Sequence, residues 1–137
     1  MARRVLVVIA SAALAVLVAG CGAPKPKPFT AKGTVACMTN KGFTHVTTDP
    51  VKVGFIAGFA DNGGLRATTR DGNVLTIAFA ADASAVDSTK QAFRNHAPAK
   101  LRPRLDDIME AQGNAVLVWT VSPTAKQLAD AQGCLHS

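Results

Sequence analysis

The chain has 137 residues, of which 15 are lysine or arginine and nine are aspartate or glutamate, so its formal net charge is +6. Much of this excess lies near the N-terminus, in Arg3, Arg4, Lys25, Lys27 and Lys32, and the rest of the chain is close to neutral. With no tyrosine and one tryptophan, the chain lacks the basic face and aromatic platforms of a nucleic-acid-binding protein, and its length allows one domain.

The first 20 residues have the layout of an export signal. Residues 1–4 carry two positive charges, and the uncharged run 5–19 is shorter than the about 20 residues that a membrane-spanning helix needs. The run ends in Val18-Ala19-Gly20-Cys21, where small residues precede a cysteine. An uncleaved anchor helix and an ordinary secretory signal are the alternative interpretations of this segment.

This arrangement resembles the lipobox signal peptide of bacterial lipoproteins. The resemblance implies that a diacylglyceryl group is attached to the sulfur of Cys21 and that a peptidase removes residues 1–20. Cys21 would then be the mature N-terminus, carrying acyl chains such as palmitate. Two or more chains suffice for stable anchoring. The expected location is the outer face of the cytoplasmic membrane, or another membrane of the cell envelope.

Residues 21–33 are predicted to be the lipidated cysteine followed by a spacer. Pro24, Pro26 and Pro28 alternate with lysine, a pattern that favours a polyproline II conformation with about 3.1 Å per residue. We expect the spacer to hold the domain near the lipid without joining its core. A single domain is then predicted over residues 34–137.

The first part of this domain is predicted to contain one helix and two strands. A helix is expected at residues 34–41 with Thr34 as its N-cap, followed by a short strand at 44–48. Residues 51–59 alternate with a period of two, which indicates a strand. Its apolar face would carry Val51, Val53, Phe55, Ala57 and Phe59.

A hairpin is predicted around Asp71-Gly72, a dipeptide typical of tight turns between strands. A two-residue loop would mix polar and apolar residues on one face. A three-residue loop at 71–73 gives one apolar face, so we predict that register. It pairs Thr69 with Leu75, Ala67 with Ile77 and Leu65 with Phe79.

The second half is predicted to add two helices and a buried strand. Residues 84–95 fit a helix capped by Asp82 or Ser84, and residues 115–121 are apolar on both faces, as in an interior strand. Residues 105–112 fit either a helix or a strand. Ser122-Pro123 is expected to open a last helix ending near Gln132. These elements predict an α+β two-layer sandwich, with a mainly antiparallel sheet of about four strands and helices on one face.

The cysteines bear on the same export hypothesis. If Cys21 carries the lipid, Cys37 and Cys134 remain as an even pair, which in an exported chain is typical of a disulfide. The alternative is a catalytic or metal-binding thiol with a histidine nearby. His45, His96 and His136 do not have the spacing of metal ligands.

The remaining candidate residues lie in one polar stretch. Residues 94–104 are basic, which suggests an anion-binding patch for wall polymers or lipid headgroups, formed by Arg94, Lys100, Arg102 and Arg104, with His96 among them. Asp106, Asp107 and Glu110 form an acidic cluster that we interpret as a solvated helix face. No nucleotide loop, zinc-protease helix or nucleophile elbow is present, so we predict no catalytic residue, metal ligand or cofactor.

Together these features predict a membrane-anchored envelope lipoprotein that acts as a non-catalytic binding or interaction module. The expected partners are the membrane, through the lipid, and an envelope protein or an anionic wall polymer. A small envelope hydrolase or transferase is an alternative that would require a cleft joining His96 to Asp106 or Asp107. An accessory subunit of an envelope transport complex is another, and an exposed apolar patch would favour it.

The domain also resembles small alanine-rich lipoproteins of high-GC Gram-positive bacteria. The resemblance rests on a layout with Cys37, the Gly42-Phe43 pair, a hairpin, the strand containing Trp119 and a cysteine near the end. It implies no particular activity.

Overall fold

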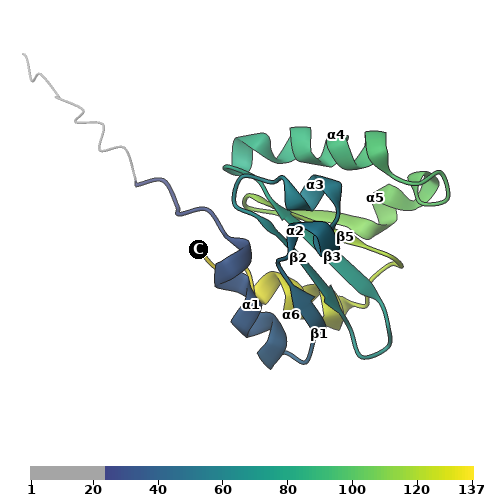
Figure 1. Ribbon diagram of the computed structural model, residues 1–137, viewed down its shortest axis with the longest axis horizontal. Helices are drawn as coiled ribbons and strands as arrows, with labels where there is room; N and C mark the ends of the chain where they lie inside the picture. The colour runs from purple at the N-terminus through teal and green to yellow at the C-terminus, as the bar shows by residue number, and fades with distance from the viewer. Residues whose placement is uncertain (1–23) are drawn as a thin grey trace, which may run out of the picture.

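The computed structural model describes residues 24–137; the leader and Cys21 lie outside the described residues. Five strands form one open, fully antiparallel sheet in the order β1-β2-β3-β5-β4 (Figure 1). The strands are β1 (Thr44–Thr47), β2 (Gly64–Thr68), β3 (Val74–Phe79), β4 (Met109–Gln112) and β5 (Ala115–Trp119).

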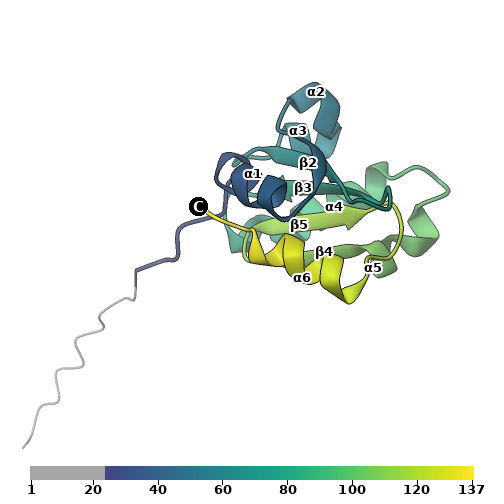
Figure 2. The same ribbon diagram turned by 90° about the horizontal axis from the view of Figure 1, so that it is seen from below.

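Helices cover both faces of this sheet, as the two views in Figures 1 and 2 show. Helices α1 and α6 lie on one face, and α2, α3 and α4 on the other. Among residues 24–137, no helix is both long and apolar enough to cross a bilayer. The helices are α1 (Ala31–Asn40), α2 (Pro50–Val53), α3 (Phe55–Gly58), α4 (Val86–His96), α5 (Leu105–Ile108) and α6 (Ala125–Gly133), with 3₁₀ turns η1 (Ala83–Ala85) and η2 (Arg102–Arg104).

The predicted α+β class with an antiparallel sheet is therefore confirmed, with two differences in detail. The sheet has a fifth strand, because residues 105–112 form both of the predicted alternatives, helix α5 and then strand β4. Helices lie on both faces because β3 and β5 are apolar on both sides. Ala78 and Val116 face away from the main core and are fully buried, so the second face needs its own cover.

The main core lies between the sheet and helices α1 and α6. Trp119 on β5 is 1% exposed and belongs to this core, as predicted for an interior strand. Its indole Nε1 is the one buried side-chain polar atom without a hydrogen-bond partner among the described residues. The strands contribute alternate residues to this face: Leu65, Ala67, Leu75, Ile77, Phe79, Ala115, Leu117 and Trp119.

A disulfide between Cys37 and Cys134 closes this layer, which confirms the predicted pair. The two Cα atoms are 5.3 Å apart, although the cysteines are 97 residues apart in sequence. The bond joins α1 to the residue that follows α6, so the beginning and the end of the domain are covalently connected. Because such bonds form and persist in oxidising compartments, the disulfide indicates an extracytoplasmic domain.

Helix α1 begins earlier than predicted. Thr30, not Thr34, is its N-cap, and the Thr30 Oγ1 accepts a hydrogen bond from the Gly33 N–H. Thr34 is buried inside the helix, where its hydroxyl donates to the Thr30 carbonyl. Phe29 packs against the core. Residues 29–33, which we assigned to the spacer, are therefore packed with the domain.

Asn114, in the turn between β4 and β5, holds this entry point in place. Its side chain is buried and accepts from the Phe29 N–H at 2.7 Å. Its Nδ2 donates to the carbonyls of Phe29 at 2.9 Å and Ala80 at 2.7 Å. One amide thus connects the start of the domain with the end of β3.

The predicted strand at 51–59 is wrong, because this segment forms the short helices α2 and α3. Asp49 caps α2 through the Val51 N–H, and Pro50 occupies the first turn, where its missing N–H costs nothing. Gly54 separates the two helices with φ of 94°, a conformation that glycine adopts without strain.

The hairpin is present with a different loop from the one predicted. Ala67 pairs with Leu75 and Leu65 with Ile77, so the three-residue loop is 70–72 and not 71–73. The predicted apolar face is confirmed, because this shift of two positions along β3 keeps each side chain on its own side. Leu65, Ala67, Leu75 and Ile77 are all fully buried.

The later elements follow the predictions more closely. Helix α4 occupies most of the expected range after the Asp82-capped turn η1, and β5 is interior, between β3 and β4. The last helix does not begin at Ser122-Pro123. Its N-cap is Thr124, which forms a reciprocal capping box with Gln127.

Candidate functional site

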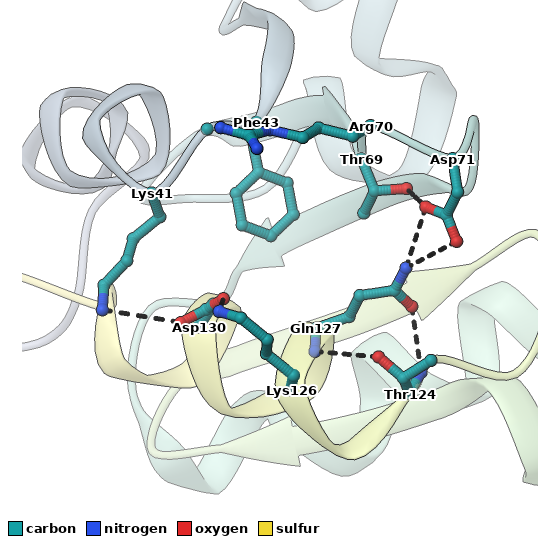
Figure 3. Close-up of a pocket in the computed structure, with 10 residues that line it drawn as sticks. Lys41, Phe43, Thr69, Arg70, Asp71, Thr124, Lys126, Gln127 and Asp130 are labelled. Atoms are coloured by element: carbon teal, nitrogen blue, oxygen red, sulfur yellow. Dashed lines mark hydrogen bonds and ion pairs between the residues drawn. The ribbon is translucent and has the colours of Figure 1, made fainter.

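A hollow in the surface lies between the end of α1, the β2–β3 loop and the first turns of α6 (Figure 3). We call it the α1–α6 pocket; its volume is about 430 Å³. Three segments far apart in sequence meet here, because the end of α1 and the start of α6 both lie beside the tip of the β2–β3 hairpin. The lining residues are Lys41, Gly42, Phe43, Thr69, Arg70, Asp71, Thr124, Lys126, Gln127 and Asp130.

On one side of the pocket, Asp130 neutralises two lysines. The Lys126 Nζ lies 2.6 Å and the Lys41 Nζ 3.5 Å from the Asp130 carboxylate oxygens. The hydrogen bond from Lys126 is the main cause of a lowered Asp130 pKa, and the charge of both lysines adds to it. Asp130 therefore remains ionised and is already occupied by cations.

On the opposite side, Asp71 is held by neutral donors. The Gln127 Nε2 donates to its two carboxylate oxygens at 2.9 and 3.0 Å, and the Thr69 hydroxyl donates to Oδ1. The Thr69 bond is the main cause of a lowered Asp71 pKa. Gln127 is itself positioned by its hydrogen bond with the Thr124 N–H, so the capping box of α6 also orients the pocket wall.

Arg70 crosses the pocket toward α1. Figure 3 shows its side chain extending from the hairpin toward the end of α1, and the ring of Phe43 directed into the hollow. A Cβ at Gly42 would lie 3.2 Å from the Arg70 Nη2, so the guanidinium fits closely against this glycine. Among the described residues, the four ion pairs do not include Arg70.

Three cations and two carboxylates line the pocket, an arrangement that can bind an anion. A general acid near neutral pH needs a raised carboxyl pKa, whereas the pKa values of Asp71 and Asp130 are both lowered. No histidine or cysteine lines the pocket. Asp130 pairs with two of the three cations that line the pocket, which leaves the Arg70 guanidinium as the cation available to an anion.

The predicted basic patch lies elsewhere, around the end of α4. The Arg94 Nη2 pairs with the Asp106 Oδ1 at 3.1 Å, and the Arg102 Nε donates to the Ala97 carbonyl at 2.9 Å. Lys100 and Arg104 are exposed. The structure thus uses two of these four side chains in local contacts, and none of the four lines the α1–α6 pocket.

The cleft that would favour an enzyme is not formed in the described part of the chain. His96 lies beside the Phe55 ring, with centroids 6.3 Å apart, and no hydrogen bond or ion pair joins it to Asp106 or Asp107. The groove that His96 borders is otherwise lined mainly by apolar residues. Residues 24–137 also contain no group of three histidine, cysteine or carboxylate side chains placed to hold a metal.

A second surface feature is an apolar one. Val51, Phe55 and Phe59 are 90%, 71% and 79% exposed, and all three lie on or just after the short helices α2 and α3. We call this segment the α2–α3 projection, because Figure 2 shows α2 and α3 standing out from one edge of the domain. An exposed group of large apolar side chains marks an interaction surface.

Comparison with protein-family models, curated proteins and solved structures finds no match to this chain. The α1–α6 pocket was not predicted from the sequence, because its walls come from three separate segments. The detectable signals were local ones, the Asp71-Gly72 turn beside Arg70 and the Thr-x-x-Gln capping pattern at Thr124.

Proposed function

We propose that this protein is an envelope lipoprotein anchored through Cys21, and that its domain is a non-catalytic binding module for an anionic ligand held in the α1–α6 pocket. The lipobox pattern and the disulfide-closed domain support export. The anchor itself remains a prediction, since Cys21 lies outside the described residues.

One observation carries the binding proposal: the Arg70 guanidinium lies in the pocket wall against Gly42 and has no carboxylate partner among the ion pairs of the described residues. A planar guanidinium binds carboxylate and phosphate groups through two parallel hydrogen bonds. Phe43 and the aliphatic stems of Lys41 and Lys126 offer apolar contact beside it. The pocket therefore fits a carboxylate or phosphate attached to an apolar or ring-shaped moiety.

Two envelope sources supply this chemistry, phosphate-rich wall polymers and acidic protein segments. Titrations with inorganic phosphate, with wall-polymer fragments and with an acidic peptide separate them. Binding is followed by amide chemical shifts at Phe43 and Thr69, which report on the pocket directly.

The deciding variant is Arg70→Gln, matched by Arg104→Gln as a control in the predicted basic patch. Because a hydrogen bond to a charged group contributes about 1.5–3 kcal/mol, we expect Arg70→Gln to weaken binding roughly 10-fold to 100-fold. Arg104→Gln should leave it unchanged. Loss of binding in Arg104→Gln but not in Arg70→Gln would move the site to the basic patch.

The anchor has a separate test in whole cells. Cys21→Ser should abolish labelling by a radioactive fatty acid and release the protein from the membrane fraction. Labelling that persists in Cys21→Ser would show that the lipobox interpretation is wrong, without affecting the pocket.

A further inference from the structure

We infer that the α2–α3 projection is a membrane-docking surface, on which Val51, Phe55 and Phe59 enter the interface of the anionic leaflet that anchors the protein. This inference rests on the proposed lipid anchor. It adds an orientation of the domain relative to the membrane, which an anchor on a spacer does not determine. The projection would contact a bilayer surface, and contact with a protein partner is the alternative that the experiment distinguishes.

Packing of α2 and α3 against the sheet holds the exposed apolar side chains of the projection outward. Val53 and Ala57 of the same two helices are 4% and 1% exposed and pack against Ala78 of β3. Phe55 and Phe59 are four residues apart and therefore share the opposite side of α3. Their rings are in contact, with centroids 5.1 Å apart. The exposure is thus a fixed feature of a packed segment.

The tether enters the domain close to the projection. The Ala31 N–H donates to the Asn62 carbonyl at 3.0 Å, so the chain enters the domain beside Asn62. Asn62 follows Phe59 by three residues, which span at most about 10 Å. The spacer before Phe29 extends by about 3.1 Å per residue. A bilayer holding Cys21 is therefore within reach of the projection.

Basic residues lie on the spacer and at the base of the projection. Lys25 and Lys27 are exposed on the spacer, and the Lys52 side chain is 69% exposed on α2. The Arg66 Nη1 donates to the Lys52 carbonyl at 3.3 Å, which brings a further cation to the base of the projection. Basic residues close to an anionic leaflet are attracted to it.

The acidic residues near the projection offset its own cations, so the positive charge that remains for an anionic leaflet is that of the spacer lysines, Lys25 and Lys27. Asp49 lies 3.7 Å from the Lys52 Nζ and is paired with it, which leaves Asp61 as the exposed carboxylate that follows Phe59. Three exposed apolar side chains close to a basic spacer have the composition of a segment that lies in a membrane interface.

A bilayer fits this feature better than a folded partner does. A specific protein interface typically buries about 800 Å² on each side, whereas the projection is a protruding pair of one-turn helices. A fluid interface accepts a protrusion without a complementary surface. The tether also keeps the domain at high effective concentration near the lipid, so even weak insertion would orient it.

The test uses the mature chain carrying Cys21→Ser, which contains every described residue and has no acyl anchor. Its binding is measured by flotation with vesicles of phosphatidylglycerol and, separately, of phosphatidylcholine. We expect binding to the anionic vesicles that weakens with salt, and at least tenfold weaker binding to the neutral ones.

The deciding variant is Phe55→Ser combined with Phe59→Ser, and the control is Val121→Ser, which alters the other large exposed apolar residue of residues 24–137. The double variant should lose at least tenfold in vesicle affinity and the control none. Phe55→Trp supplies a second readout, because insertion shifts its emission to the blue while buried Trp119 stays constant.

Two results would overturn the inference: no binding of the parent to anionic vesicles, or equal binding of the double variant. If the parent fails to bind vesicles but a photo-crosslinker at position 55 captures one protein in cells, the surface is a protein interface. Arg70→Gln must bind vesicles like the parent, so failure of docking and failure of the pocket proposal are distinguishable. The fatty-acid labelling of Cys21 separately tests the anchor.

Discussion

The sheet face under α1 and α6 and the face under α2, α3 and α4 are built from the same strands but are covered to different degrees. The first face carries the large buried side chains, Trp119 among them, and is closed by the Cys37–Cys134 disulfide. On the second face, α4 has no buried residue and α3 exposes Phe55. The domain therefore concentrates its stability on one face, which leaves the other available for contact with its surroundings.

The largest expected effect on stability comes from removing the Cys37–Cys134 disulfide, which links α1 to the end of α6 on the first face. Replacing both Cys37 and Cys134 by alanine should lower the free energy of unfolding by about 2–5 kcal/mol, because the bond closes a long loop. Urea unfolding measures this. The parent under reducing conditions should match the double variant, and a loss under 1 kcal/mol would show that noncovalent packing alone defines this face.

A matched pair of truncations compares the two faces directly. Leu117→Ala, in the main core, should cost about 2–5 kcal/mol. Phe93→Ala, on the half-buried side of α4, should cost about 1–2 kcal/mol although it removes a larger side chain, because Phe93 is already partly solvated. Equal losses in urea unfolding would contradict the difference between the faces.

An intermediate effect is expected at the entry of the tether. Asn114→Ala removes three hydrogen bonds and leaves the part-buried Phe29 N–H and C=O without this partner, whereas the Ala80 carbonyl keeps its bond from the Asn62 Nδ2, so the variant should cost about 1–3 kcal/mol. Hydrogen exchange at the Phe29 amide should accelerate by more than exchange in β3. Unchanged protection of Phe29 would mean that core packing alone holds this residue.

The smallest effect concerns the pocket carboxylates. The pKa of Asp130 is lowered below its ordinary value of 3.8 in the folded state, mainly by the Lys126 hydrogen bond. Its contribution to stability is therefore present above about pH 4 and is lost as the pH falls through the lower folded pKa. Asp130→Asn should flatten the acid limb of the plot of stability against pH below about pH 4. If the variant loses stability with falling pH as steeply as the parent, Asp130 is not the source of that loss.

The sequence predicted the elements whose signals are local and agree with their packing. The Asp71-Gly72 turn, the apolar run through Trp119 and the cysteine pair each pointed to what the structure contains. The loop of the hairpin was predicted one residue too late, because sliding the partner strand by two positions preserves the same apolar face.

Residues 51–59 show why the rest was not predictable from the pattern. Their alternation indicates a strand only if all the apolar residues face inward, and here Phe55 and Phe59 face solvent. The stronger signal was Asp49-Pro50, an N-cap followed by a residue suited to the first turn of a helix. The α1–α6 pocket could not be predicted, since no local pattern shows that the Arg70 side chain reaches Gly42 at the end of α1.

Amide hydrogen exchange over the whole mature chain tests the difference between the two faces most directly. We expect amides of α1, β3, β5 and α6 to exchange only through global unfolding, whereas those of α2, α3 and α4 should exchange through local opening at a lower free energy. Equal protection of α4 and α6 would contradict this expectation, because the second face would then be as firmly packed as the first.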